Sequence, residues 1–358
     1  MGQLKQARPV QHVTEHPRRK WTLGHKLVGL ALLAAIGLSC CLLDPRCRAD
    51  VAGIAPSIPV VPDFDQTRAW NDLVYQVNAG YRIPGTATHR AVRDWLVSQL
   101  AICVKNVQLQ AFTEHINGKD VPLWNIIAVM PGTGKGSKEL IMLSAHWDSR
   151  PICNMDPDPA NRNLPLPGAN DGASGVAVLL EIARQLKVHP VSRTVKIVLF
   201  DGEDYSWPGE DVDHDGVDYM LLGAKYFAQH PGNPKPAWGI LLDMIGNPVL
   251  DIYREPYSDE HAKAVNDRIF HAAKVLNYRG ASHVSGFYDS LYEDQQGNPL
   301  TIEDDHTPLN AAGIPTADVI DFNYPVWHTR QDDVAHVSAA SLGIVGRTIL
   351  YAISPQGD

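Results

Sequence analysis

Residues 195–205, VKIVLFDGEDY, join a run of apolar residues directly to three carboxylates. The apolar run is rich in β-branched residues, which is typical of a strand buried on both faces. The acids that follow are Asp201, Glu203 and Asp204. Carboxylates at the tip of a buried strand are costly to desolvate unless a cation or hydrogen-bond donors meet them. A solvated turn built on Gly202 would explain one such tip, so the question is whether other strands end in the same way.

Helices and strands alternate on both sides of this stretch. Besides 195–200, the apolar spacing predicts strands at 107–112, 124–130, 139–145, 238–242 and 313–321. It predicts helices at 64–78, 89–101, 176–186, 219–229, 260–276 and 338–351, with a loop-rich segment at 281–298. This alternation favours an α/β fold, a three-layer sandwich with a central mixed, largely parallel sheet flanked by helices.

The chain divides into three regions. Residues 1–49 combine a basic stretch, an uncharged apolar run at 27–43 and the small-x-small sequence Cys47-Arg48-Ala49, the layout of an export signal cleaved near Ala49. An uncleaved N-terminal membrane anchor is the alternative, because the apolar run is long for a cleaved signal and short for a span. Residues 50–63 predict an extended lead-in, and residues 64–358 a single catalytic domain. We therefore expect a periplasmic or extracellular protein that meets the membrane only through an uncleaved leader.

The composition limits the class of partner. The chain has 358 residues, and its leader carries eight of the 31 basic and two of the 40 acidic residues. The remaining chain therefore has a net charge of about −15. A body this acidic would repel the phosphates of a nucleic acid, whereas cationic partners such as peptide N-termini remain compatible. Only Cys103 and Cys153 of the five cysteines lie in the body, and both a disulfide and two free thiols are compatible with export.

Residues with metal-binding side chains follow several other predicted strands. His146 and Asp148 follow the strand that ends at 145, Asp243 follows the strand that ends at 242, and His328 follows the last strand. Asp171 lies just before a predicted helix. Ligands of an open α/β sheet bind at the carboxyl ends of its strands, so we expect these residues to converge. Several acids and two histidines in one place need a positive charge, and mixed ligation of this kind suits zinc.

The chain resembles the zinc aminopeptidase and glutaminyl cyclase superfamily, with bacterial glutaminyl cyclase-like members the nearest in pattern. The resemblance covers nearly everything after residue 64, and each short motif is weak alone but specific in combination. The matching segments are SAHWDSR (144–150), GANDGASG (168–175), FDGED (200–204), LLDMIG (241–246), DDHTPL (304–309) and VWHT (326–329). The resemblance implies a zinc exopeptidase-like fold and a zinc-dependent catalytic domain.

The resemblance also implies roles for single residues. Asp171, Asp204 and His328 match the ligands of one zinc ion, and Glu203 matches the general acid/base. Asp204 stands where the family commonly has Glu, so a shifted zinc position is expected.

Two-metal members of the superfamily use further residues. In them, positions matching His146 and Asp243 hold a second zinc ion and the position of Asp171 bridges the two ions. Asp148 would orient His146 through a hydrogen bond. Cyclases keep these positions but use a single zinc ion, so the ligand set alone does not separate the branches.

Trp327 is the residue that best separates them. The cyclase pattern has Trp before the histidine ligand, whereas the peptidases usually show Tyr-His-Thr. The pair Asp305 and His306 resembles the cyclase segment whose acid and histidine join a hydrogen-bond network with the residue matching Asp243. The polar insertion that carries Trp207 also occurs in cyclase-like members, so Trp207 and Trp327 are expected to contact substrate.

The resemblance therefore favours a zinc-dependent glutaminyl-peptide cyclotransferase, which converts the N-terminal Gln of peptides to pyroglutamate and releases ammonia. One zinc ion would polarise the side-chain amide, Glu203 would move the proton, and Asp243 with the Asp305–His306 pair would stabilise the intermediate. The alternative is a two-metal zinc aminopeptidase, in which Glu203 activates a water. A binding protein on an inactive enzyme fold fits poorly, because every matched catalytic position holds a competent residue.

Residues 211–216, DVDHDG, match the first half of a calcium-binding loop. The twelfth position of that loop is Leu222 in place of the bidentate Glu. A solvated acidic loop is therefore favoured over a calcium site.

Overall fold

The computed structural model describes residues 62–355 with gaps at 117, 206–218 and 281–284. Pro59–Asp358 form one compact unit. The leader, Trp207 and the 211–216 loop lie outside the described residues, so the predictions for them stay predictions. Within the described part of the chain, no helix is both long enough and apolar enough to cross a membrane.

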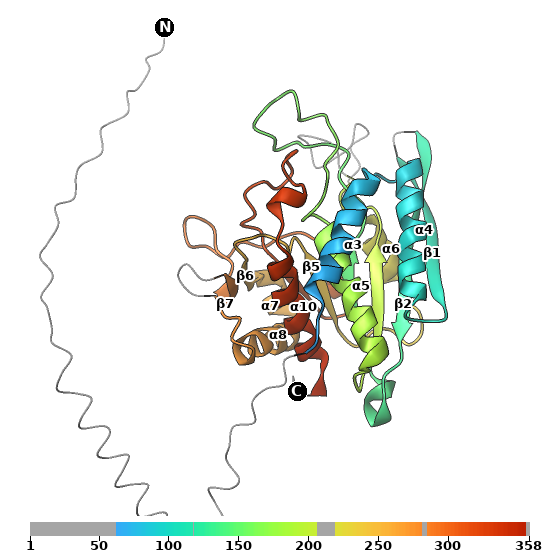
Figure 1. Cartoon of the computed structure of the whole chain (residues 1–358), viewed down its shortest axis with the longest axis vertical. Helices are drawn as coiled ribbons and strands as arrows, with labels where there is room; N and C mark the ends of the chain where they lie inside the picture. Colours follow the sequence, from blue (N-terminus) through green and yellow to red (C-terminus); the bar gives the residue numbers. More distant parts are fainter. Residues whose placement is uncertain (1–61, 117, 206–218, 281–284, 356–358) are drawn as a thin grey trace, which may run out of the picture. The chain divides into compact units, whose positions relative to one another are not determined.

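The main sheet is mixed and has the strand order β1-β2-β4-β3-β5-β8 (Figure 1). Strands β4, β3, β5 and β8 run parallel to one another, and the β1–β2 hairpin joins the sheet with β2 antiparallel to β4. This confirms the predicted largely parallel α/β sheet. Its strands are β1 (Val107–Ile116), β2 (Lys119–Met130), β3 (Leu140–His146), β4 (Thr194–Phe200), β5 (Gly239–Asp243) and β8 (Thr316–Ile320).

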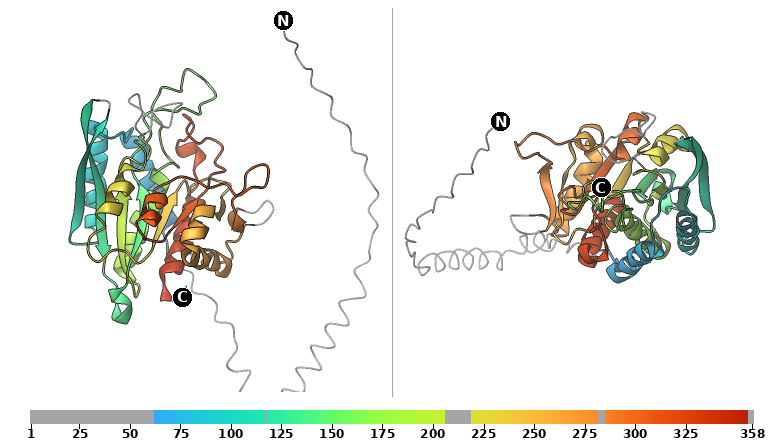
Figure 2. Two further views of the ribbon diagram at one scale, coloured as in Figure 1. Left: turned by 180° about the vertical axis from the view of Figure 1, so that it is seen from behind. Right: turned by 90° about the horizontal axis from the view of Figure 1, so that it is seen from above.

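Helices cover both faces of the sheet (Figures 1 and 2). Successive strand side chains point to opposite faces, so Ile126 and Ala128 of β2 join the larger core cluster while Ile127 joins a smaller one. The larger cluster contains residues of α3 (Gln66–Ala79), α4 (Ala87–Ala101), α5 (Ala173–Val188), α8 (Lys263–Val275) and α10 (Ala339–Ile353). The smaller cluster contains residues of α6 (Leu222–Gln229) and α9 (His306–Ala311). The sheet therefore forms the middle of three layers, as expected.

Side-chain caps fix where the first helices begin. The Asp65 carboxylate accepts hydrogen bonds from the amides of Thr67 and Arg68 at the start of α3. The Thr86 hydroxyl accepts from the amide of His89, so α4 begins two residues before the predicted start.

Several segments differ from the sequence prediction, and α9 was not predicted. The helix predicted at 260–276 is two helices, α7 (Pro256–His261) and α8, which are separated at Ala262 where the backbone is not helical. The helix predicted from 219 begins at Leu222, because Met220 pairs with Asp204 in an isolated β-bridge. The strands β6 (Asp251–Arg254) and β7 (Gly286–Leu291) form a separate small sheet that was not predicted.

Candidate functional site

The predicted site residues converge at the carboxyl ends of the parallel strands. β3 ends at His146, which lies opposite Phe200, the last residue of β4. β5 ends at Asp243, and the turn after β4 carries Glu203 and Asp204. The parallel register therefore brings residues that are far apart in sequence to one edge of the sheet.

Asp171, Asp204 and His328 form the first group of possible metal ligands. The Nε2 atom of His328 lies 3.5 Å from an Asp171 oxygen and 3.6 Å from an Asp204 oxygen. These separations are long for hydrogen bonds and suit three donors that share one cation. The Arg150 guanidinium donates to the other Asp204 oxygen, which leaves Oδ2 of Asp204 as a buried atom without a hydrogen-bond partner among the described residues.

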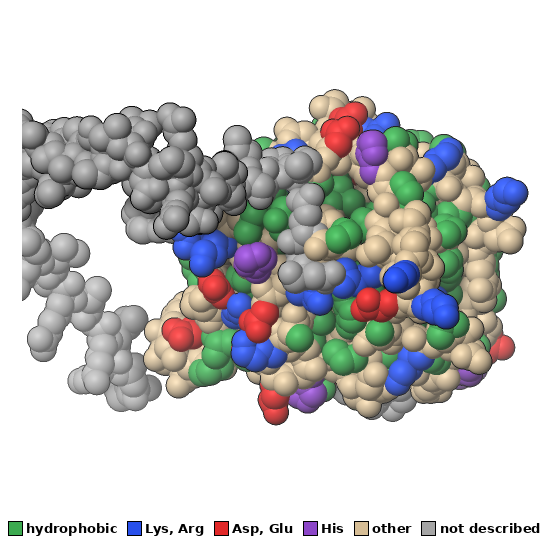
Figure 3. Space-filling model, turned by 90° about the horizontal axis from the view of Figure 1, so that it is seen from below, with side chains coloured by type: hydrophobic (Ala, Val, Ile, Leu, Met, Phe, Trp, Pro, Cys, Tyr) green, Lys and Arg blue, Asp and Glu red, His purple; other side chains and the backbone are tan. Residues whose placement is uncertain are grey.

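The side chains of this group are held away from water. Asp171, Asp204 and His328 are between 1% and 6% exposed. Acids on the protein surface have a different environment. On the face in Figure 3, Asp and Glu side chains are exposed to solvent and lie near Lys and Arg side chains. Burial raises the pKa of Asp204 to about 8, although the Arg150 charge opposes the rise. Burial lowers the pKa of His328 to about 3, so its imidazole is the neutral form that binds metals.

His146, Asp171 and Asp243 form a second group that shares Asp171 with the first. Here Nε2 of His146 lies 3.1 Å from Asp171 and 3.2 Å from Asp243, within the range of direct hydrogen bonds. Burial opposes the charge on His146, but hydrogen bonds to Asp148, Asp171 and Asp243 hold its pKa well above the usual range. A proton on Nε2 of His146 can therefore lie between the carboxylates of Asp171 and Asp243.

Asp148 fixes the turn that carries Glu203 and Asp204. One of its oxygens accepts a hydrogen bond from the Glu203 amide at 3.1 Å and lies 3.4 Å from Nδ1 of His146. The other accepts from the Asp204 amide at 3.2 Å. A single buried carboxylate thus contacts one residue of each group, whereas the prediction for Asp148 concerned only its hydrogen bond to His146.

Asp201 has a different environment from its two neighbours in the same turn. Its carboxylate lies 2.8 Å from Nε2 of His89 and accepts from the Trp124 amide at 2.7 Å. Asp201 therefore ties the turn to α4 and β2 and does not face either group of ligands.

Backbone strain is concentrated at the site. His328 has a φ of +54°, in the left-handed region that non-glycine residues rarely adopt. Gly172, at φ +82°, precedes α5, and a Cβ atom there would lie 2.8 Å from Cε1 of His146. The left-handed backbone at residue 328 positions the His328 side chain, and the glycine at 172 lets Asp171 approach His146.

A small cavity of about 60 Å³ opens beside the first group. Glu203 and Asp243 line it with the apolar side chains of Ile302, Phe322 and Trp327. Burial, with the neighbouring carboxylates of Asp204 and Asp304, raises the pKa of Glu203 well above its usual range. A larger cavity of about 380 Å³ shares Ile302, Phe322 and Trp327 and continues outward. The two cavities can admit a narrow chain end and the residues that follow it.

Asp304, which the sequence prediction did not single out, is the buried acid of its segment that lines the small cavity. Asp305 and His306 are fully buried and are not among the described residues that line it, and their predicted role in stabilising the intermediate with Asp243 stays a prediction. Asp304 and Asp305 are adjacent in the sequence, and only the structure shows that Asp304 is the one that lines the cavity. Arg150, within the quoted SAHWDSR segment, was likewise not predicted to contact Asp204.

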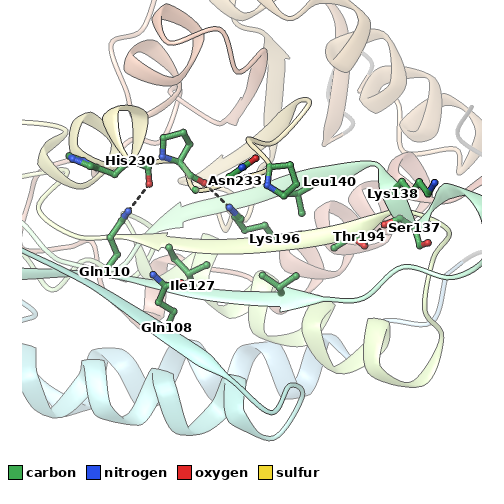
Figure 4. Close-up of a pocket in the computed structure, with 14 residues that line it drawn as sticks. Gln108, Gln110, Ile127, Ser137, Lys138, Leu140, Thr194, Lys196, His230 and Asn233 are labelled. Atoms are coloured by element: carbon green, nitrogen blue, oxygen red, sulfur yellow. Dashed lines mark hydrogen bonds between the residues drawn. The ribbon is translucent and has the colours of Figure 1, made fainter.

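A further groove of about 380 Å³ lies at the other ends of the strands (Figure 4). Leu140 and Thr194, at the starts of β3 and β4, line it together with Lys196 and His230. The described residues that line it include a single histidine and no carboxylate. It therefore lacks the combination of histidine and carboxylates found at the carboxyl ends of the strands.

Comparisons with known proteins agree with this geometry. The chain is 25% identical over 278 residues to the glutaminyl-peptide cyclotransferase of Drosophila melanogaster, covering 73% of each protein. It is 34% identical to the solved glutaminyl cyclase of Bacteroides thetaiotaomicron bound to N-acetylhistamine, with a TM-score of 0.72, covering 82% of this chain and 99% of that one. It is 31% identical to a Zn-dependent exopeptidase from Parabacteroides distasonis, with a TM-score of 0.72, covering 83% of this chain and 100% of that one.

The family match covers the strands and loops that carry the site. The pattern of peptidase family M28 matches residues 125–353, which is more than half of the chain. Zinc is the metal indicated by the Zn-dependent exopeptidase among these relatives and by the buried nitrogen and oxygen donors. The chain belongs to peptidase family M28.

Proposed function

We propose that this protein is a zinc-dependent glutaminyl-peptide cyclotransferase, which converts the N-terminal Gln of peptides to pyroglutamate and releases ammonia. The observation that carries the proposal is the position of Trp327. Its indole stacks on the His328 imidazole with ring centroids 3.9 Å apart, and it lines both cavities. A flat apolar wall beside the metal ligands suits the aliphatic part of a glutamine side chain folded back toward its own amine.

Asp171, Asp204 and His328 would hold the catalytic zinc ion. The support is the donor set, the burial and the unpartnered oxygen of Asp204. Zinc bound there supplies a Lewis acid for the carbonyl of the glutamine side chain. Arg150 holds the second oxygen of Asp204, so only one oxygen of that carboxylate is left for the metal.

Glu203 moves the proton in the proposed reaction. It takes a proton from the α-amine, whose nitrogen attacks the side-chain carbonyl carbon and forms the ring C–N bond. The bond to the original amide nitrogen then breaks, and Glu203 returns the proton so that ammonia leaves. Burial and the nearby acids raise the pKa of Glu203, which brings its proton affinity closer to that of the groups it serves.

Asp243 is the acid that would face the substrate on the other side. It lines the small cavity, and its carboxylate can accept a hydrogen bond from the amide nitrogen as that nitrogen gains charge. Asp305 and His306 are fully buried beside the cavity, and the charge of Asp305 contributes directly to the raised pKa of Glu203.

A single catalytic zinc ion is favoured over two. The His146 nitrogen is at hydrogen-bonding distance from Asp171 and Asp243, whereas His328 is set farther from its two acids. A proton on His146 is thus enough to link the carboxylates of its group, whereas the longer distances around His328 suit a metal ion.

The test is the product formed from a peptide that begins with Gln. The proposal predicts a product that has lost one ammonia and kept every residue, as measured by mass spectrometry. A product shortened by its first residue would instead identify a zinc aminopeptidase, the alternative that the His146 group and the family allow.

We also propose that residues 1–49 direct export and are removed near Ala49. The support is the order of basic stretch, apolar run and small-x-small sequence. N-terminal sequencing of protein from the periplasm or medium should begin close to Asp50, and a retained Met1 in the membrane fraction would favour an anchor.

A further inference from the structure

A separate cluster of metal-binding side chains lies behind the cavity wall. We propose that Asp304, His306 and Asp318, here called the Asp304 cluster, bind a structural divalent transition-metal ion such as zinc. One ligand atom from each residue lies within 4.8 Å of the others. The three residues are at most 3% exposed. Carboxylates and imidazole in this proportion also make up the proposed catalytic zinc group.

Glu255 determines which nitrogen of His306 faces the cluster. The Glu255 carboxylate accepts hydrogen bonds from the amides of Tyr257, Ser258 and Ile302. A carboxylate that already accepts from three backbone amides acts as an acceptor at this position. Nε2 of His306, 3.1 Å away, therefore donates to it. Nδ1 of His306 is then directed away from Glu255, toward Asp318.

The distances on that side of His306 resemble those of a metal site. Nδ1 lies 3.6 Å from an Asp318 oxygen, the same separation as between His328 and Asp204. The buried His89–Asp201 pair, which is joined by a direct hydrogen bond, is only 2.8 Å apart. The gap at His306 is therefore too long for a hydrogen bond and is suited to two ligands of one ion.

Four polar atoms of the cluster have no hydrogen-bond partner in the described part of the chain. Nδ1 of His306, Oδ2 of Asp304 and both carboxylate oxygens of Asp318 have no hydrogen bond there. Three acceptors that face one another in a buried place repel each other unless a cation lies between them. The hydrogen bond from His306 to Glu255 is also the arrangement that usually orients a metal-bound imidazole.

The ion would join three elements that form the back of the site. His306 begins α9, Asp318 lies in β8, and Glu255 caps α7 and accepts from the Ile302 amide. Asp304 belongs to the cavity wall. The expected role is to hold this wall in place, and the ion takes no part in the reaction.

The test compares zinc content among full-length proteins that have been stripped with a chelator and dialysed against zinc chloride. Asp318→Asn should bind one zinc ion fewer per chain than the wild type. Asp321→Asn is the matched control, because Asp321 is also fully buried but accepts from Asn247 and the Asp251 amide. It should bind as much zinc as the wild type. Equal zinc content in a folded Asp318→Asn variant would overturn the proposal.

Anomalous diffraction from wild-type crystals soaked in zinc chloride gives a second readout that does not depend on folding of a variant. A peak between Asp304, His306 and Asp318 is expected, in addition to the peak at His328. Absence of the first peak overturns this proposal whatever is bound at His328. The cyclase proposal is judged separately, by the product formed from a Gln-peptide.

Discussion

The indole of Trp327 lies against the imidazole of His328, with an interplanar angle of 26°. The same two residues line both cavities, so one aromatic surface forms the wall beside the proposed zinc ligand and continues toward the exterior. Phe322 extends this surface, with its ring centroid 5.1 Å from that of Trp327. The stack holds His328 in its strained conformation and gives the substrate an apolar face.

Replacing Trp327 should therefore weaken the use of substrate. An aromatic stack contributes about 1 kcal/mol, so Trp327→Ala should lower kcat/KM roughly fivefold or more. Trp327→Phe, which keeps a ring against His328, should retain most of the activity. Equal losses in both variants, measured by ammonia release from a Gln-peptide, would contradict a role for the stack.

Glu203→Gln should remove the group that moves the proton and leave the metal ligands in place. A positioned acid/base typically contributes on the order of 10²- to 10⁴-fold in rate, and kcat should fall by that range. Zinc per chain, measured by mass spectrometry, should stay at the wild-type value. Glu260→Gln, at an exposed position of α7, serves as the control. A Glu203→Gln variant with near-normal kcat would rule out the assigned role.

Asp148→Asn should impair activity through misplacement of other residues. The asparagine oxygen can accept from only one of the Glu203 and Asp204 amides, and its NH2 group would face the other amide N–H and lose that hydrogen bond. Loss of an orienting carboxylate of this kind costs roughly 10- to 100-fold in activity or metal affinity. Zinc titration together with kcat measures both effects. Unchanged values for both would show that the turn is held by other contacts.

Removal of zinc should abolish activity reversibly. After treatment with a chelator, ammonia release should cease, and added zinc should restore it. Magnesium should fail to restore it, because Mg²⁺ prefers oxygen ligands in octahedral geometry and His328 supplies a nitrogen. Full activity in metal-free protein would refute a metal centre at Asp171, Asp204 and His328.

Arg82 should be important for stability. It is fully buried and donates to the carbonyl oxygens of Trp147 and Gly168 at 2.9 and 2.6 Å, on either side of the site. Each carbonyl left without a donor costs about 1–3 kcal/mol, so Arg82→Met should lower the free energy of unfolding by at least about 2 kcal/mol. Arg90→Met, which removes an exposed bond to the Gly85 carbonyl, should change it much less. Urea unfolding of the two variants is the measurement.

The sequence was sufficient to predict the sheet and the convergence of the site because both depend on regular patterns. Apolar runs such as 195–200 end where the strands end, and parallel strands place their last residues at one edge. The order β1-β2-β4-β3-β5-β8 depends on which strands meet in space, and this is not encoded in their local periodicity. The short strands β6 and β7 were missed because they contain too few residues for a pattern.

The details of the site depended on tertiary contacts. The sequence pattern singled out Asp305, whereas in the structure Asp304 lines the small cavity and Asp305 is fully buried. Arg150 reaches Asp204 across 54 residues of sequence, and no local signal predicts such a contact. Cys103 and Cys153, for which the sequence allowed either state, are both free thiols.

The central claim is that Glu203 acts on the amine of the peptide and not on a water. The most direct measurement offers the zinc-loaded full-length protein a Gln-peptide and a leucine anilide under the same conditions. The account predicts ammonia release from the Gln-peptide, its loss in Glu203→Gln, and no free aniline. Aniline release without ammonia would contradict the account and identify an aminopeptidase.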